Sequence, residues 1–302
     1  MDLSVQIGSL RMKNPVTVAS GTFGYGPEYA ELVDINRLGA IVVKGIALES
    51  TPGNPTDRTF ETSSGMINAI GLPNPGFKGF VDQYMPFLRR HEVPVIVNIW
   101  GRTVEEYEGI AQAFDTVDGV HALELNVSCP NIKEGSAMFG TCESSFRRVV
   151  EGVRKQTTLP LIPKLAPNVT DIRLFARAAE ECGADAISLI NSIPAMAIDI
   201  ETRRPRIANV TGGLTGPAIK PVALKLVRDA ASVVSIPVIG MGGISSAADA
   251  LEFIIAGASA VAIGTANFVN PGTALSVIDG ISSYFKTHEL TTIPELRGTL
   301  QS

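Results

Sequence analysis

Cys129 is the residue with the sharpest chemistry in the sequence, and it stands in the segment Asn126-Val-Ser-Cys-Pro-Asn131. A cysteine placed directly after a buried strand can act as a nucleophile or a general base, because its thiolate forms near neutral pH. Many free cysteines are simply small buried residues. The polar setting between Asn126 and Asn131 favours the chemical role, whereas Cys142 and Cys182 lack such a setting and are interpreted as structural.

Two lysines and several asparagines have the side-chain types needed to hold a planar ring. Lys44 and Lys164 stand in segments predicted to be largely buried, where an ammonium group needs an anionic or electron-rich partner. Amide side chains offer paired donors and acceptors, which suit an amide-rich ring better than a sugar or an apolar chain. The candidate amides are Asn68, Asn98, Asn126 and Asn191.

Glycines near the C-terminal third of the chain suggest a phosphate site. Gly242-Gly243 and Gly264-Thr265 follow two apolar runs, and glycines let backbone N–H groups approach an anion at the start of a helix. No group of acidic residues and no histidine pair indicates a metal site. The three histidines fall in presumed helical or loop segments, where we expect surface residues rather than ligands.

All these residues follow short apolar runs, as expected of parallel strands that are buried on both faces. Because chemistry in a barrel of parallel strands collects at the carboxyl ends of the strands, the polar residues should share one rim. The predicted strands are Pro15–Ser20, Ala40–Gly45, Val93–Ile99, Ala122–Val127, Leu161–Leu165, Ala186–Ile190, Pro237–Gly240 and Ala260–Gly264.

Segments with helical spacing alternate with these runs and predict a single-domain (β/α)8 TIM barrel over residues 1–302, with a peripheral polar tail at about 287–302. An open doubly wound sheet is the main alternative, but no GxGxxG turn follows an early strand. We expect Ser144 or Ser145, Thr170 and Gly183 to cap helices. The predicted helices are Tyr29–Leu38, Phe77–Arg90, Val104–Phe114, Ser144–Lys155, Asp171–Cys182, Ile219–Val233, Ala247–Ala256 and Ala274–Phe285.

Composition excludes several classes of protein. Hydrophobic residues make up 45% of the 302 residues and the net charge is −5, which argues against disorder and against binding to nucleic acid or an anionic membrane. Three cysteines do not suggest a disulfide framework. With neither a signal-like start nor an apolar run of membrane-spanning length, we expect a cytoplasmic protein.

Five segments together resemble the class 1 dihydroorotate dehydrogenases, in order and spacing, from Gly8 to about Phe285. They are Asn68-Ala-Ile-Gly-Leu-Pro-Asn74, Asn126-Val-Ser-Cys-Pro-Asn131, Lys164-Leu-Ala-Pro-Asn168, Thr211-Gly-Gly-Leu-Thr-Gly-Pro-Ala-Ile-Lys-Pro221 and Gly240-Met-Gly-Gly-Ile244. The resemblance implies an FMN-binding barrel that oxidises (S)-dihydroorotate to orotate in pyrimidine synthesis. Class 2 enzymes are less similar, because they place serine at the position of Cys129 and carry an N-terminal extension.

The resemblance also implies roles for individual residues. Cys129 would be the catalytic base that removes the C5 proton while the C6 hydride passes to FMN. The FMN-binding residues would be Ser20, Gly21, Lys44, Gly45, Asn98, Asn126, Lys164, Ile190, Gly216, Gly242, Gly243, Gly264 and Thr265. The residues that bind dihydroorotate would be Lys44, Asn68, Ala69, Ile70, Gly71, Leu72, Asn126, Asn131, Asn191 and Ser192.

Within class 1, the segments Gly53-Asn-Pro-Thr56, Glu201-Thr-Arg-Arg-Pro205 and Thr211-Gly-Gly-Leu-Thr215 resemble the NAD-linked form. In that form a homodimer of catalytic subunits pairs, as a heterotetramer, with an electron-transfer subunit that carries FAD and a [2Fe–2S] cluster. Neither a GxGxxG motif nor a cysteine cluster is present in this sequence, so NAD chemistry would depend on that partner.

Three alternatives stay open from the sequence. One is the fumarate-linked homodimeric form of the same enzyme, and another is a related flavin barrel that acts on a different pyrimidine. The third is a non-catalytic barrel that binds phosphate or serves as a scaffold. The segment from Ile132 to Cys142 could be a lid over the reaction or an ordinary surface loop.

Overall fold

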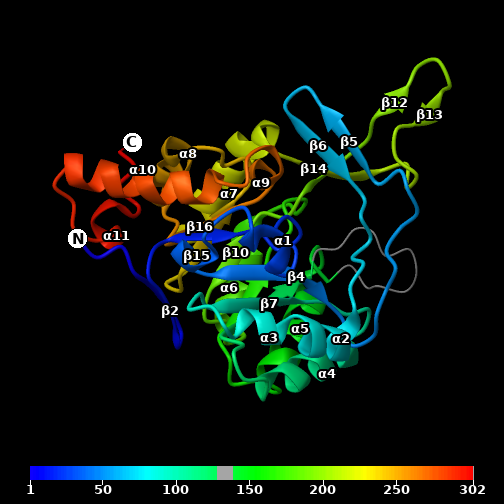
Figure 1. The fold of residues 1–302 in the computed structure, drawn as a ribbon, viewed down its shortest axis with the longest axis horizontal. Coiled ribbons are helices and arrows are strands. Elements are labelled where there is room, and N and C mark those ends of the chain that lie inside the picture. The colour runs from blue at the N-terminus through cyan, green and yellow to red at the C-terminus, as the bar shows by residue number, and fades with distance from the viewer. Residues whose placement is uncertain (128–138, 302) are drawn as a thin grey trace.

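The structure is a computed structural model that describes residues 1–127 and 139–301. Its centre is a sheet of eight parallel strands in the order β3-β16-β15-β10-β9-β8-β7-β4, and the bridge between Thr17 and Ala40 joins β3 to the start of β4 and closes the barrel (Figure 1). The predicted (β/α)8 barrel is thereby confirmed. Its strands are β3 (Val16–Val18), β4 (Ile41–Ile46), β7 (Val95–Ile99), β8 (Ala122–Asn126), β9 (Leu161–Lys164), β10 (Ile187–Leu189), β15 (Val238–Met241) and β16 (Ala260–Ile263).

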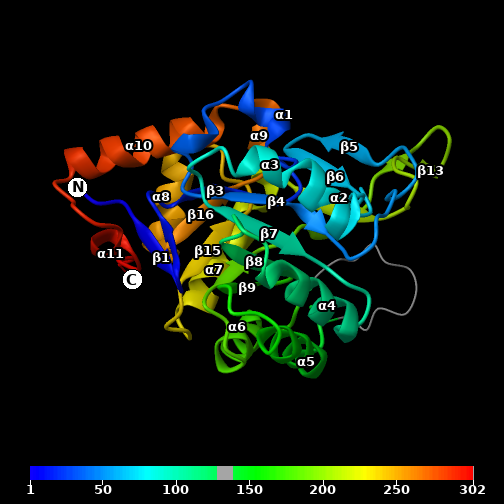
Figure 2. The same cartoon turned by 60° about the horizontal axis from the view of Figure 1, so that its bottom comes forward.

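Helices surround the barrel, and Figure 2 shows α4, α5 and α6 lying outside β7, β8 and β9. The strands are therefore buried on both faces, which explains their nearly continuous apolar sequences. The helices are α1 (Pro27–Ala30), α2 (Gly76–Gln83), α3 (Met85–Leu88), α4 (Val104–Asp115), α5 (Glu143–Arg154), α6 (Ile172–Glu181), α7 (Lys220–Ala231), α8 (Ala247–Ala256), α9 (Ala266–Val269), α10 (Thr273–Thr287) and α11 (Ile293–Leu296), with 3-10 turns at Ile35–Arg37 and Pro217–Ile219.

Two of the predicted helices are broken in the structure. The helix expected over 29–38 is instead α1 and a separate 3-10 turn, because the Asp34 side chain accepts a hydrogen bond from the Asn36 backbone N–H and begins a new turn there. The helix expected over 77–90 is divided into α2 and α3. Pro86 has no N–H to continue the hydrogen-bond ladder of α2, so a new helical segment begins around it.

Helix caps agree with the prediction in part. Gly183 follows α6 with a φ of 85°, as expected of a glycine after a helix. Asp171, not Thr170, caps the start of α6, and its carboxylate accepts from the Arg173 N–H. Neither Ser144 nor Ser145 caps α5, which begins one residue earlier with Cys142 at the N-cap position and no capping side chain.

A second, antiparallel sheet stands beside the barrel and was not predicted. Its order is β11-β14-β6-β5, and it pairs residues 66–68 with residues 213–215 although nearly 150 positions separate them. Figure 1 shows it, with the β12–β13 hairpin beyond, on the side of the molecule away from both termini. The strands are β5 (Thr59–Thr62), β6 (Gly65–Asn68), β11 (Ile193–Ala195), β12 (Ile198–Asp199), β13 (Arg204–Pro205) and β14 (Gly212–Thr215).

The N-terminal and C-terminal segments of the chain cover the amino end of the barrel, where the strands begin. The hairpin of β1 (Val5–Ile7) and β2 (Leu10–Met12) buries Ile7 and Met12 completely, and its turn residue Gly8 lies against Asp185 and Pro160, which precede β10 and β9. The tail, which the sequence predicts to be peripheral, forms α11, buries Ile293 and Leu296, and bonds to the end of α8. Among the described residues, no helix combines the length and apolarity needed to cross a bilayer.

Candidate functional site

A cavity of about 520 Å³ opens at the carboxyl ends of the barrel strands. All eight barrel strands, or the residues that directly follow them, contribute to its wall, and the second sheet adds side chains from β5, β6 and β14. This is the place where the polar residues were predicted to meet. A closed ring of parallel strands brings together residues that are far apart in the sequence, such as Ser20 and Thr265, which are 245 positions apart.

The structure brings nearly all the predicted site residues together in this cavity. Every predicted FMN-binding residue lines it: Ser20, Gly21, Lys44, Gly45, Asn98, Asn126, Lys164, Ile190, Gly216, Gly242, Gly243, Gly264 and Thr265. Most residues that are predicted to bind dihydroorotate but not FMN line the cavity too, namely Asn68, Ile70, Gly71, Leu72, Asn191 and Ser192. Cys129 and Asn131 lie outside the described residues.

Ala69 does not line the cavity, although its neighbours Asn68 and Ile70 do. It is 1% exposed and packs with Ile67 and Ile207 in a small apolar cluster beneath the second sheet. Successive residues of an extended segment point to opposite sides, which explains why Ala69 faces away from the cavity while Asn68 and Ile70 line it.

The sequence also missed several residues of the wall. They come mainly from the second sheet and from the turns after the last strands, and they are Ala19, Thr22, Thr59, Met66, Thr215, Ile219, Met241 and Phe268. The only sequence signal for Thr22 and Met241 was their position next to a predicted strand end. Thr59, Met66 and Thr215 depend on the distant pairing of β6 with β14, which leaves no local signal.

Lys164 provides a buried cation at the floor of the cavity. Its ammonium donates to Ser20 Oγ over 3.3 Å and lies 3.6 Å from Glu124 Oε1, and its side chain is only 8% exposed. The predicted need for an anionic partner is thus met by Glu124, which the sequence interpretation did not single out. The ion pair keeps a positive charge next to a largely apolar core.

Lys44 provides a second cation in the wall, and it is half-buried. Burial lowers its pKa below the ordinary value, the nearby Arg58 guanidinium lowers the pKa further, and Glu28 opposes the shift. Both causes of the lowered pKa disfavour the ammonium form. A carboxylate bound beside Lys44 would offset both causes and favour the ammonium form.

The amide side chains are held in fixed orientations around the cavity. Asn68 Nδ2 donates to the Gly213 carbonyl over 3.2 Å, and Asn191 Oδ1 accepts from the Ser192 N–H over 2.8 Å. Asn98 is fully buried, and within the described part of the chain its Oδ1 has no hydrogen-bond partner. An orphaned buried acceptor is costly, so it indicates a position where a ligand N–H completes the structure.

Two features of the wall fit a phosphorylated flavin. A Cβ atom added to Gly21 would meet nothing within 4 Å, and one added to Gly264 would meet only Ala19 Cβ at 3.6 Å, so both glycines border open space. Gly243 has a φ of 75°, and a Cβ there would come within 2.8 Å of the Gly216 carbonyl oxygen. The backbone is therefore accessible to an anion at positions where side chains are absent.

Histidines and the other described cysteines lie away from this cavity. His91, His121 and His288 do not line it, in agreement with their predicted places. Cys182 is buried, and its burial is the main reason that the pKa of its thiol is raised to about 11. Cys142 is exposed, and hydrogen bonding, chiefly from Ser144, lowers its pKa to about 7. Among the described residues no cluster of three His, Cys, Asp or Glu side chains could hold a metal ion.

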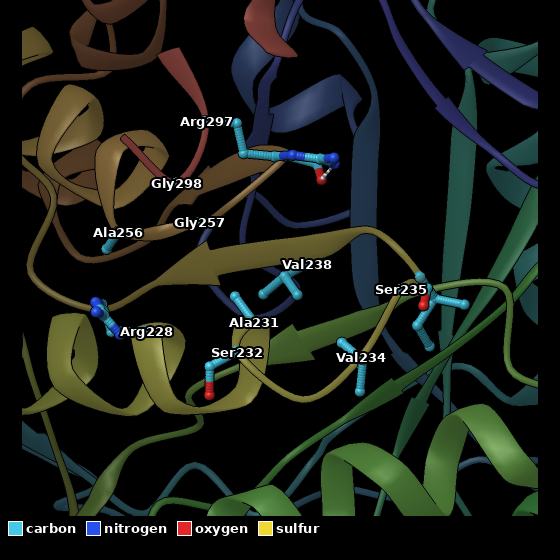
Figure 3. A pocket seen from close by; sticks show the side chains of 12 residues that line it. Arg228, Ala231, Ser232, Val234, Ser235, Val238, Ala256, Gly257, Arg297 and Gly298 are labelled. Atoms are coloured by element: carbon cyan, nitrogen blue, oxygen red, sulfur yellow. Dashed lines mark hydrogen bonds between the residues drawn. The ribbon is translucent and has the colours of Figure 1, made fainter. Parts of the chain in front are cut away.

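A smaller cavity of about 280 Å³ lies at the other end of the barrel, near the starts of β15 and β16 (Figure 3). Its wall is made by the ends of α7 and α8 and by the tail, and Arg297 crosses it to donate to Ser259 Oγ over 2.9 Å. No motif in the sequence predicts this smaller cavity. Ser259 is the buried polar residue of this wall. The other arginines and serines that line it are exposed, and they are Arg228, Ser232, Ser235 and Arg297.

The amino-acid sequence of this chain is similar to a family model and to several known proteins. A family model described as "Dihydroorotate dehydrogenase" matches residues 2–285. Proteins named "Dihydroorotate dehydrogenase B (NAD(+)), catalytic subunit" are similar over nearly the whole length. One from Thermoanaerobacter pseudethanolicus is 54% identical over 301 residues, covering 100% of this chain and 99% of the relative. One from Alkaliphilus metalliredigens is 51% identical over 300 residues, covering 99% of both chains.

A third such relative, from Geotalea daltonii, is 50% identical over 300 residues, covering 99% of this chain and 98% of its own. The family match extends over both the barrel and the second sheet, so it includes every described residue that lines the cavity at the carboxyl ends of the strands. The resemblance seen in the sequence motifs is thereby confirmed, and the chain belongs to the dihydroorotate dehydrogenase family.

Proposed function

We propose that this chain oxidises (S)-dihydroorotate to orotate in the de novo synthesis of pyrimidines, with FMN as its cofactor. The observation that carries the proposal is the single cavity that unites two lysines, four asparagines and the glycines that follow the last two strands. Family membership and the names of the relatives agree with it. In chemical terms the enzyme is an oxidoreductase that acts on a CH–CH bond.

The cofactor proposal rests on the fit of the wall. Gly21, Gly216, Gly242, Gly243, Gly264 and Thr265 border space suited to the phosphate side of FMN, and Asn98 with Lys164 offers a buried acceptor and a cation for the ring. When bound, FMN would accept the hydride that leaves C6 of dihydroorotate. The Lys164 ammonium would lie where it could stabilise negative charge on a ring bound there.

The substrate proposal assigns the remaining polar groups. Lys44 attracts the carboxylate of dihydroorotate, and Asn68, Asn126, Asn131 and Asn191 bind the amide groups of its ring. Cys129 is the proposed base, and its thiolate takes the proton from C5 as the C6 hydride leaves, so that a carbon–carbon double bond forms. The segment 132–142 is proposed to exclude water from this reaction.

The electron acceptor is proposed to be NAD+, as in the names of the relatives. Their description as catalytic subunits implies a separate electron-transfer subunit. We propose that this partner carries FAD and a [2Fe–2S] cluster, and that two copies of the present chain form the core of a cytoplasmic heterotetramer.

Turnover with defined substrates tests the proposal. Purified protein supplied with dihydroorotate and an artificial electron acceptor should form orotate, with little activity on dihydrouracil or dihydrothymine. NADH should form only after the electron-transfer subunit is added. Fumarate reduction by the isolated chain would instead support the fumarate-linked form, and activity on dihydrouracil alone would overturn the substrate assignment.

A further inference from the structure

Glu124 stands one layer below the cavity, inside the barrel, and it does not line the cavity. It lies on β8, two residues before the cavity-lining Asn126, and it is 2% exposed. Its two oxygens are both occupied: Oε1 accepts from Asn98 Nδ2 over 2.6 Å, and Oε2 accepts from Ser188 Oγ over 2.9 Å. The Lys164 ammonium lies 3.6 Å from Oε1.

The three partners of this carboxylate come from the neighbouring strands of the sheet. Asn98 is on β7, Lys164 on β9 and Ser188 on β10, and the sheet registers place Asn98 beside Glu124 and Ser188 beside Lys164. Glu124 therefore connects four consecutive strands at one level of the barrel. Two of the residues that it contacts, Asn98 and Lys164, form part of the cavity wall.

Stability alone does not explain a carboxylate at this position. The interior of such a barrel is ordinarily filled by branched apolar side chains. A buried ion pair contributes no more than well-packed apolar residues of similar volume, because both ions lose their hydration. The reason for Glu124 should therefore be found in what it does to its partners.

Each contact of Glu124 determines what its partner offers to a ligand. Because Asn98 Nδ2 donates to the carboxylate, the Asn98 Oδ1 is the atom that stays available as an acceptor. The same carboxylate lies beside the Lys164 ammonium, which also donates to Ser20 in the cavity wall. One acceptor and one cationic donor thus stand on neighbouring parts of the cavity floor.

We propose that Glu124 is a positioning residue, which orients the Asn98 amide and holds the Lys164 ammonium so that together they bind a ring with adjacent N–H and C=O groups, and which thereby sets the relative affinity for oxidised and reduced flavin. This inference rests on the proposed function, since it takes the ring to be that of FMN. Glu124 touches neither the cofactor nor the substrate, and it acts through Asn98 and Lys164.

The decisive variant is Glu124→Gln, because glutamine can keep the acceptor for Asn98 and can donate to the Ser188 oxygen, and only the charge is lost. Without its counter-charge, the buried Lys164 ammonium leaves its position or loses its charge. Reduced FMN should then lose about tenfold of its affinity relative to oxidised FMN, which lowers the two-electron midpoint potential by about 30 mV. The measurements are the midpoint potential of the bound flavin and the binding of oxidised FMN to the FMN-free chain.

The matched control is Asp185→Asn, which removes the carboxylate of another ion pair, with Arg154, at the other end of the barrel. This variant should lower the melting temperature and leave the midpoint potential unchanged. If Glu124→Gln behaves in the same way, Glu124 is merely structural and the proposal is wrong. A rise in potential would also contradict it, since the carboxylate would then act only as a negative charge through space.

Two further variants keep the test decisive if Glu124→Gln does not fold. Ser188→Ala removes one hydrogen bond from the carboxylate and should shift the potential in the same direction by a smaller amount. Lys164→Met combined with Glu124→Gln replaces the ion pair by a neutral pair, and its potential should equal that of Lys164→Met alone. A further shift in the double variant would overturn positioning through Lys164. A wild-type chain that binds no FMN would refute the proposed function itself, which is a separate outcome.

Discussion

The two ends of the barrel each contain an ion pair, and the two pairs differ in their surroundings. At the carboxyl end, the side chains of Lys164 and Glu124 are 8% and 3% exposed and adjoin the larger cavity. At the amino end, the side chains of Arg154 and Asp185 are 25% and 31% exposed. Asp185 there also accepts from the Leu161 N–H, so its pair completes the backbone hydrogen bonding at the start of a strand.

The difference in burial separates the pair for which we propose a functional role from the pair with a structural one. The half-buried Arg154–Asp185 pair keeps part of its hydration, and its bond to the Leu161 N–H accounts for its presence. A deeply buried pair loses much hydration, and the chain accepts that cost beside the cavity where a charged ring is proposed to bind. The amino end is instead covered by the β1–β2 hairpin and by α11, with apolar side chains such as Ile7 and Ile293.

The largest expected effect is the loss of turnover when Cys129, the proposed base at the carboxyl end of the barrel, is replaced. Cys129→Ala should retain yellow FMN but lose about 10²–10⁴-fold in turnover at neutral pH, which is the usual contribution of a general base. Steady-state rates with dihydroorotate measure it, and Cys129→Ser should recover activity only at high pH. Near wild-type turnover in Cys129→Ala would exclude this residue as the base.

A smaller effect is expected from the cation in the cavity wall. Lys44→Met should weaken orotate binding to the FMN-loaded protein by about 10–100-fold, since a hydrogen bond to a charged group contributes about 1.5–3 kcal/mol. Arg228→Met, in the cavity at the amino end, is the matched control and should leave the affinity unchanged. Equal losses in both variants would mean that charge in general, and not the position of Lys44, governs binding.

A methyl group added at Gly21 should weaken the binding of FMN without changing the stability of the fold. Gly21→Ala places a Cβ where nothing lies within 4 Å, so the melting temperature of the FMN-free chain should stay within a degree or so of wild type. FMN affinity should fall by about tenfold, because the methyl group occupies space proposed for the cofactor. Titration of the FMN-free variant with FMN measures this, and unchanged affinity would remove Gly21 from the site.

The smallest effect concerns pH and the support of the glycine turn after β15. Burial raises the pKa of Asp249, but hydrogen bonds from Lys220, Ser245 and Ser246 outweigh it and lower the pKa from 3.8 to about 2. A carboxyl group whose pKa is lowered by folding stabilises the native state above its unfolded pKa, and this contribution disappears as the pH falls through the folded pKa. It should amount to about 1–2 kcal/mol.

The pH effect is measured by the unfolding of wild type and Asp249→Asn from pH 6 to pH 2. The advantage of the wild type should be constant above about pH 4.5 and should vanish toward pH 2. A constant difference over the whole range would show that Asp249 contributes no charge-dependent stability.

Much of the barrel could be predicted from the sequence for a physical reason. Strands buried on both faces leave continuous apolar runs such as Val95–Ile99, and helices on the outside leave amphipathic segments between them. The predicted helix Ala247–Ala256 matches α8 to the residue, and in the structure Ser246 caps its start and Gly257 follows its end. The strand ends then fixed where Lys44, Lys164 and Asn98 would meet.

Other parts of the site left no local signal. β5 and β6 are short and half-exposed, and their partner β14 is far away in the sequence, so their contribution to the cavity follows only from tertiary pairing. Glu124 did have a signal, since a charged residue interrupts the apolar run Ala122–Asn126. Its importance depends on Asn98, Lys164 and Ser188, which come together only when the barrel closes.

The visible absorption spectrum of the purified chain, recorded without oxygen before and after dihydroorotate is added, tests the central claim most directly. We predict a yellow protein with about one FMN per chain, whose flavin band bleaches when dihydroorotate is added and returns when an artificial acceptor follows. A colourless protein that does not take up FMN, or a yellow protein whose band dihydroorotate leaves unchanged, would contradict the account.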